Sequence, residues 1–163
     1  MDWTDYFLGI AEQVKLKSKD ESTQIGAVIV GKDKEILSTG YNSFPRGLND
    51  NLKERQERPE KYYFMVHAEA NAIVNAAKNG ILIDGSKIFL TCGIPCSECT
   101  KLIINSGIKE IICKNINDDV KGEIWINSKK KSLEMIKECG IKLSFYDMKN
   151  NNYLDYNWDI KRM

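Results

Sequence analysis

Residues 86–113 read SKIFLTCGIPCSECTKLIINSGIKEIIC, a segment in which two β-prone runs enclose a helix signal. The runs cover 86–91 and 109–113 and are short, largely apolar and bounded by turn residues. Between them, Pro95 suits the first position of a helix that we expect to end near Asn105, before Gly107. A strand, a helix and a second strand in this order predict a right-handed crossover between parallel strands. The segment therefore predicts an α/β fold.

The same alternation continues on both sides of this segment. The further expected elements are a helix over 4–17, a hairpin of strands 27–30 and 35–39, a helix from His67 to about Lys78, a helix over 129–138 and a strand over 142–146. Together they predict a three-layer α/β/α domain with a central mixed sheet of about five strands. We expect a single domain over 1–163, with a C-terminal extension at about 148–163.

Three segments do not fit regular structure. Residues 40–47 combine proline with flanking glycines and predict a shaped loop, a kind of segment that often carries function. Residues 49–61 are almost wholly polar, and the sequence leaves open whether they form a lid or a mobile excursion. The aromatic residues of 150–163 show no clear period. That segment could cover the core, complete a neighbouring subunit's pocket or remain loose.

Composition excludes several classes of protein. Hydrophobic residues make up 42% of the chain and charged residues 29%, and 24 Lys plus Arg against 23 Asp plus Glu leave a net charge of +1. This balance disfavours a strongly basic binder of polymeric nucleic acid. No run approaches the roughly 20 apolar residues of a membrane span, and residues 1–10 lack the pattern of a signal peptide. We therefore expect a cytoplasmic protein with no membrane partner, whose five cysteines are reduced thiols.

Two short motifs place potential metal ligands at the starts of two predicted helices. They are His67-Ala68-Glu69 and Pro95-Cys96-Ser97-Glu98-Cys99. Their combination matches the zinc deaminase signature, His-x-Glu followed by Pro-Cys-x-x-Cys. Three protein ligands leave a fourth position for water, which is typical of catalytic zinc. The sequence therefore predicts one catalytic Zn²⁺ per chain, bound by His67, Cys96 and Cys99, with no organic cofactor.

Two other interpretations of these cysteines stay open. Cys96 and Cys99 could form a redox pair, although a histidine and a glutamate at matched helix starts have no role in such a site. Alternatively, a fourth protein ligand could close a structural zinc site. The candidates for it are Cys92, Cys113 and Cys139.

Glu69 is the expected general acid and base. It follows the metal-binding histidine by two residues and can lie beside the metal without binding it. We expect it to take a proton from the attacking water, pass a proton to the ring nitrogen and then protonate the departing amine. Backbone amides near Ala68 and Cys96 can orient the ring and stabilise developing charge.

Over about residues 5–113 the chain resembles the cytidine/deoxycytidylate deaminase superfamily, and most closely its dCMP deaminase branch. Beyond the zinc signature, the resemblance rests on the segments 22–30, Gly40-Tyr41-Asn42 with Pro45-Arg46-Gly47, and 66–73. It implies a cytidine-deaminase-like fold, dCMP as the small-molecule substrate, and assembly into a homo-oligomer, either a dimer or a hexamer. It also implies substrate contacts. These are Asn42 to the sugar hydroxyl, Ser43 or Arg46 near the phosphate, and Asn71 as a second pocket residue.

The resemblance also exposes differences and alternatives. The chain has Ser43 where many members have glycine, and about Asn117 where many have an aromatic pocket residue. Another cytosine nucleotide or nucleoside, or adenosine in tRNA, is an alternative substrate. The RNA alternative has only the lysines of 129–131 as a basic patch. A zinc-stabilised binding module without activity is a further alternative, and it would require Glu69 to be incidental.

Overall fold

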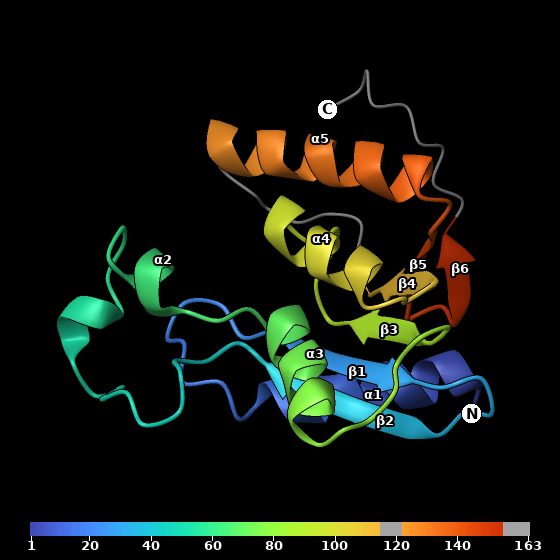
Figure 1. Cartoon of the computed structure of the whole chain (residues 1–163), viewed down its shortest axis with the longest axis horizontal. Helices are drawn as coiled ribbons and strands as arrows, with labels where there is room; N and C mark the ends of the chain where they lie inside the picture. Colours follow the sequence, from blue (N-terminus) through green and yellow to red (C-terminus); the bar gives the residue numbers. More distant parts are fainter. Residues whose placement is uncertain (115–121, 155–163) are drawn as a thin grey trace.

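A six-stranded mixed sheet organises the computed structural model, which describes residues 1–114 and 122–154. The strands lie in the order β2-β1-β3-β4-β5-β6 across the sheet (Figure 1). They are β1 Gly26–Val30, β2 Ile36–Tyr41, β3 Lys87–Leu90, β4 Glu110–Cys113, β5 Lys142–Asp147 and β6 Asn152–Leu154. β1 pairs antiparallel with both β2 and β3. The strands β3, β4 and β5 are parallel to one another, and β6 pairs antiparallel with β5 at the edge of the sheet. The predicted α/β fold with a mixed sheet is confirmed.

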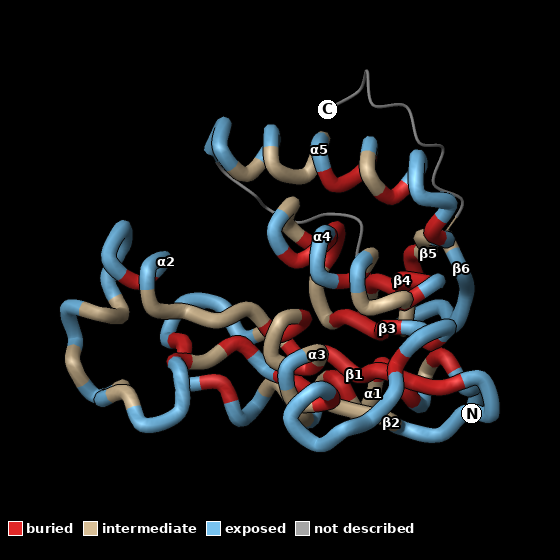
Figure 2. The backbone as a smooth tube through the Cα atoms, viewed as in Figure 1, coloured by how far each residue is buried: buried red, intermediate tan, exposed pale blue. Residues whose placement is uncertain are grey.

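Helices cover both faces of the sheet. Those described are α1 Trp3–Lys15, α2 Lys61–Phe64, α3 Ala68–Lys78, α4 Ser97–Asn105 and α5 Glu123–Glu138, with a 3-10 turn at Lys53–Arg55. α1 lies on one face, while α3 and α4 lie on the other and α5 packs on α4 (Figure 1). The buried hydrophobic residues accordingly form two clusters, one on each face of the strands. Buried positions run along the central strands and the parts of the helices that cover them (Figure 2). The three-layer arrangement is therefore as predicted.

The apolar stripe of α1 explains the smaller cluster. Phe7, Leu8 and Ala11 are buried against strand side chains that point to the same face, including Val28 and Phe89. The larger cluster lies between the sheet and the helices on the opposite face. Its members include Ala72 and Ala76 of α3, Ile103 of α4 and Ile136 of α5. Among the described residues, no helix combines the length and the apolar character that crossing a membrane requires.

Glycine at position 40 allows close packing where α3 crosses β2. A Cβ atom there would collide with the backbone of Ala68 and Ala72 on α3. Because those contacts are backbone atoms, only a residue without a side chain fits this crossing. The short distance holds the start of α3 directly above the end of β2.

At the opposite end of the strands, Glu110 lies between two lysines. Lys87 and Lys142 pair with it across the strands, at N–O distances of 2.8 and 2.9 Å. Burial acts to raise the pKa of Glu110, but the hydrogen bonds from the two lysines outweigh it and leave the pKa below its usual value. These three residues begin β4, β3 and β5, so they stabilise the amino ends of the parallel strands.

The structure differs most from the sequence prediction at the last strand and at the start of α5. β6 adds a strand to the about five expected, and it lies inside the predicted C-terminal extension, of which 155–163 fall outside the described residues. α5 begins at Glu123 rather than near 129, because residues 124–126 are β-branched or aromatic and hide the helical period. Residues 49–64, called the excursion below, project beyond the layered body and contain α2 (Figure 1).

Candidate active site

Strand direction brings the two predicted motifs together. β2 and β3 are both antiparallel to β1, so they are parallel to each other and their carboxyl ends meet at the same edge of the sheet. α4 follows β3 at this edge, and α3 crosses the end of β2. His67 is the N-cap residue of α3, and Cys96 is the N-cap residue of α4. Two helix N-termini therefore converge at the carboxyl ends of the strands, where α/β sheets commonly bind ligands.

The three predicted ligands form one compact group. His67 Nδ1 lies 3.4 Å from Cys96 Sγ and 3.4 Å from Cys99 Sγ, and the three donor atoms all lie within 4.8 Å of one another. A tetrahedral zinc ion, with Zn–S near 2.3 Å and Zn–N near 2.0 Å, spaces such atoms about 3.5 Å apart. The donor set and its spacing therefore fit a zinc ion.

The other cysteines stand outside this group. Within residues 1–114 and 122–154, the group contains His67, Cys96 and Cys99 and no fourth donor. The Cys113 thiol donates instead to the Gly93 carbonyl at 3.1 Å. Three donors are the number found at catalytic zinc sites, whereas structural sites have four.

Protonation equilibria within the group favour a thiolate. A hydrogen bond with Cys99 and another with His67 lower the pKa of the Cys96 thiol to about 4, although burial opposes this shift. The hydrogen bond with Cys96 raises the pKa of His67 to about 9. The pKa of Cys99 is raised by its hydrogen bond with Cys96 and by burial. Cys99 and His67 thus stabilise the thiolate of Cys96 by hydrogen bonds. A bound metal ion would stabilise the same thiolate.

Glu69 lies in the first turn of α3 and is 3% exposed. Burial raises the pKa of its carboxyl group, while the charge of His67 acts in the opposite direction. A carboxyl group whose pKa moves up towards neutrality can both accept and return a proton. Its position outside the three-donor group leaves it available for that exchange.

The residues predicted to contact substrate lie on one connected patch. Asn71 Nδ2 donates to Ser43 Oγ at 3.1 Å and to the Tyr41 carbonyl at 2.8 Å, so it joins α3 to the loop after β2. Arg46 Nη2 donates to Asn75 Oδ1 at 2.6 Å, one turn further along α3. Ala68 is the first residue of α3, where backbone N–H groups have no partner within the helix. These substrate contacts stay predictions.

Asn42 is more constrained than the sequence suggests. Its side chain is buried, and Nδ2 donates both hydrogens, to Asp20 Oδ2 and to the Thr23 carbonyl. Oδ1 accepts from the Ile25 backbone at 2.8 Å, which leaves one lone pair on that oxygen. If Asn42 contacts a sugar hydroxyl, it does so as an acceptor.

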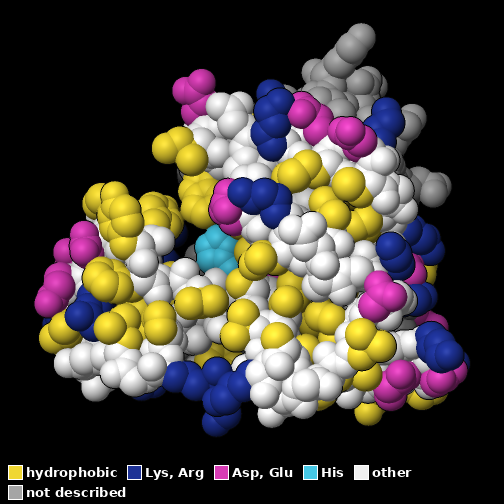
Figure 3. Space-filling model, viewed as in Figure 1, with side chains coloured by type: hydrophobic (Ala, Val, Ile, Leu, Met, Phe, Trp, Pro, Cys, Tyr) yellow, Lys and Arg dark blue, Asp and Glu magenta, His cyan; other side chains and the backbone are white. Residues whose placement is uncertain are grey.

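Two aromatic side chains near the metal group were not predicted. The Trp125 ring, from the start of α5, stacks on His67 with centroids 6.3 Å apart and 29° between the planes. Tyr62, from α2, meets Trp125 edge-on at 5.7 Å. The chain's one histidine, cyan in Figure 3, is visible in a hollow of the surface. No sequence signal marked Trp125, and Asn117, the position compared with the family's aromatic residue, lies outside the described residues.

Comparison with known proteins assigns the family. A sequence model described as the cytidine and deoxycytidylate deaminase zinc-binding region matches residues 1–115, more than half of the chain. The chain belongs to the cytidine and deoxycytidylate deaminase family. The resemblance inferred from the motifs is therefore confirmed, and both motifs lie within the matched region.

Individual relatives agree with membership of the deaminase family. A mouse (Mus musculus) deoxycytidylate deaminase is 40% identical over 117 residues, which cover 69% of this chain and 64% of the relative. A protein of Aliivibrio fischeri named as an uncharacterized deaminase is 35% identical over 143 residues, covering 88% of this chain and 92% of the relative. This chain thus spans somewhat less than two thirds of the mouse relative but nearly all of the bacterial one.

A solved deaminase structure has a similar architecture. The dCMP deaminase of the cyanophage S-TIM5, in complex with dCMP and dUMP, superposes with a TM-score of 0.68 at 27% identity. The match covers 86% of this chain and 94% of that protein. The cytidine-deaminase-like fold expected from the resemblance is confirmed.

Proposed function

We propose that this protein is a zinc-dependent deaminase that converts dCMP and water to dUMP and ammonia. The observation that carries the proposal is the group of three donor atoms at two helix N-termini, with the buried carboxyl group of Glu69 beside it. The names of the mouse and cyanophage relatives support dCMP as the substrate.

His67, Cys96 and Cys99 would hold one zinc ion per chain. When bound, zinc makes water acidic enough to act as a nucleophile near neutral pH. Glu69 accepts a proton from the attacking water and delivers one to the ring nitrogen next to the amino-bearing carbon. Glu69 then takes the second proton, from the new hydroxyl group on that carbon, and gives it to the amino group, so that the C–N bond breaks to leave ammonia and a keto group. The backbone N–H groups at Ala68 and Cys96 orient the ring.

The loop after β2 supplies the nucleotide contacts in this proposal. Asn42 accepts from a sugar hydroxyl through its remaining lone pair, while Ser43 and Arg46 lie towards the phosphate. Arginine suits this role because its planar donors bind phosphate oxygens in pairs. Asn71 holds Ser43 from α3, at 3.1 Å.

We also propose that the chain works as a homo-oligomer, either a dimer or a hexamer. The outer surfaces of α3, α4 and the connection between α3 and β3 carry exposed apolar side chains that support this. They are Val74, Leu82 and Leu102. Sedimentation analysis of the purified protein measures the state directly, and a monomer at micromolar concentration would overturn this part of the proposal.

A substrate panel tests the proposed activity. The purified, zinc-quantified protein is incubated with dCMP, CMP, deoxycytidine, dCTP or an adenosine-containing RNA hairpin, and ammonia release is measured. We expect about one zinc per chain and the highest kcat/KM for dCMP. Activity on the RNA alone would replace dCMP deamination by tRNA adenosine deamination. Zinc-loaded protein inactive on every compound would instead support the non-enzymatic zinc module.

A further inference from the structure

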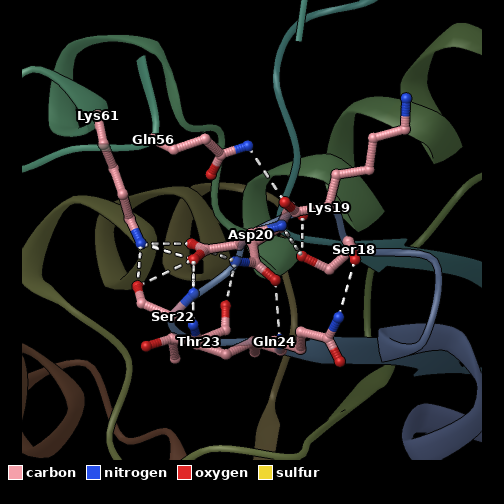
Figure 4. Close-up of polar contacts among 10 residues, drawn as sticks. Ser18, Lys19, Asp20, Ser22, Thr23, Gln24, Gln56 and Lys61 are labelled. Carbon is pink, nitrogen blue, oxygen red and sulfur yellow. Dashed lines mark hydrogen bonds and ion pairs between the residues drawn. The ribbon is translucent and has the colours of Figure 1, made fainter. Parts of the chain in front are cut away.

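A buried ion pair connects the excursion to the body of the protein. Lys61, the first residue of α2, lies with its Nζ atom 2.7 Å from each carboxylate oxygen of Asp20, and the two side chains are 6% and 2% exposed. Lys61 Nζ also donates to Ser22 Oγ at 2.6 Å (Figure 4). These three contacts match the three hydrogens of the ammonium group. Residues 41 positions apart are thereby fixed in one geometry.

Asp20 extends this contact into the loop between α1 and β1. Its Oδ1 atom accepts from the backbone N–H groups of Ser22 and Thr23, at 2.8 and 3.0 Å. Burial acts to raise the pKa of Asp20, but the hydrogen bond from Lys61 and those from the loop outweigh it and hold the pKa below its usual value. Asp20 therefore stays ionised opposite the lysine.

The same carboxylate fixes the orientation of Asn42. Asp20 Oδ2 accepts from Asn42 Nδ2 at 3.1 Å, and the Thr23 carbonyl accepts the second hydrogen at 2.7 Å. Both partners of Nδ2 can only accept, so the amide cannot be reversed. Asn42 Oδ1 is thereby left with the lone pair that the proposed function assigns to the substrate sugar.

Only a short segment of chain, residues 61–67, separates Lys61 from the metal-binding His67. Val66 forms an antiparallel bridge with Ser43, with backbone hydrogen bonds of 3.0 and 2.8 Å, and the next residue is His67. The segment 61–67 is thus tied to the loop after β2 at two points. One tie is the Ser43–Val66 bridge, and the other is Asp20, which contacts both Lys61 and Asn42.

We propose that the Lys61–Asp20 ion pair is a positioning device for nucleotide binding, which holds Asn42, Ser43 and the excursion in the geometry that receives the sugar and phosphate. The inference rests on the proposed function, because it assigns the pair to the binding of that substrate. Among the described residues, no hydrogen bond joins the pair to Glu69 or to the three metal-binding residues. The charge of Lys61 acts to lower the pKa of His67, but it is the smallest of the effects on that pKa. Loss of the pair should therefore change KM more than kcat.

A second ion pair offers a matched control. Lys19 and Asp50 join the same two segments at 2.8 Å, but their side chains are 62% and 30% exposed. An exposed pair contributes little to holding geometry, because water competes for both charges. The variant K19M therefore removes a connection between loop and excursion without disturbing Asp20 or Asn42.

The test compares K61M, the double variant D20N/K61M and K19M in steady-state deamination of dCMP. K61M leaves a buried carboxylate without its partner and can fail to fold, whereas D20N/K61M removes both charges and avoids that cost. We expect KM to rise at least threefold in D20N/K61M, with kcat within threefold of wild type and zinc content unchanged. K61M, where folded, should show at least the same rise, and K19M should change KM less than threefold.

Tryptic cleavage after Lys53 and Arg55 gives a readout independent of turnover. We expect faster cleavage in D20N/K61M than in K19M, because only the former releases α2. A KM within threefold of wild type in D20N/K61M, or an equal rise in K19M, would overturn the positioning role. Failure of the proposed function is distinguishable, since zinc-loaded wild type would then release no ammonia from dCMP.

Discussion

Replacing Glu69 by glutamine separates proton transfer from every other property of the site. The amide has nearly the same shape as the carboxyl group but cannot exchange protons. Because Glu69 is 3% exposed, bulk water cannot easily take over its role. Each proton transfer by a positioned side chain is worth about 10²- to 10⁴-fold in rate, and the proposed mechanism assigns Glu69 more than one. We therefore expect kcat to fall by at least about 10⁴-fold, equivalent to about 5.4 kcal/mol of activation free energy.

In E69Q, stability and zinc content should be retained although activity is lost. A buried carboxylate is costly to desolvate, and glutamine removes that cost. The thermal midpoint of E69Q should therefore equal or exceed that of wild type, and its zinc content should be unchanged because Glu69 lies outside the three-donor group. The assay is ammonia release from dCMP at saturating substrate, with zinc measured on the same sample. A zinc-loaded E69Q protein that keeps more than about 1% of wild-type kcat would refute the assigned role.

Three further predictions address binding and stability. R46A should raise the KM for dCMP about 10- to 100-fold, since a charge-assisted hydrogen bond contributes about 1.5–3 kcal/mol. The KM for deoxycytidine, which has no phosphate, should stay unchanged. Equal effects on both compounds would contradict phosphate binding by Arg46. E110Q should lower the thermal midpoint at pH 7 by about 2–4 °C. Because the pKa of Glu110 is lowered on folding, this difference should shrink as the pH falls below the usual value of 4.5 and vanish once the pH lies below the lowered pKa of the folded state. A difference that persists at still lower pH would show that charge is not its cause. G40A should lower the thermal midpoint by at least about 4 °C, because the added Cβ atom would collide with the backbone of α3. An unchanged midpoint would contradict the close packing of α3 on β2.

Local patterns predicted most of the fold. The strands and helices of 67–113 followed from apolar spacing, Pro95 and the glycine stops, and the structure places each within two residues of the expected bounds at most ends. The predicted start of α5 was wrong because the first turns of this helix contain residues that favour strands, and the helix nevertheless begins at Glu123. β6 was missed because three residues at a sheet edge give too short a pattern.

The site was predictable to the extent that it is written in short motifs. His67, Cys96 and Cys99 could be grouped from the sequence because their spacing matches a known signature, and the structure brings their donor atoms together. The Lys61–Asp20 pair and the stacking of Trp125 on His67 had no such signature. Both join residues more than 40 positions apart, so only the folded chain reveals them.

The two ends of the parallel strands carry different groups of residues. Glu110 and its lysine partners secure one end, while the helix starts that carry His67 and Cys96 occupy the other. The ion pairs of Glu110 involve none of the loops at the latter end, so changes in those loops leave these pairs in place. A substitution in the loops around the candidate site should therefore leave the pairing of β3, β4 and β5 intact, whereas one that separates Asp20 from Lys61 should be tolerated less readily.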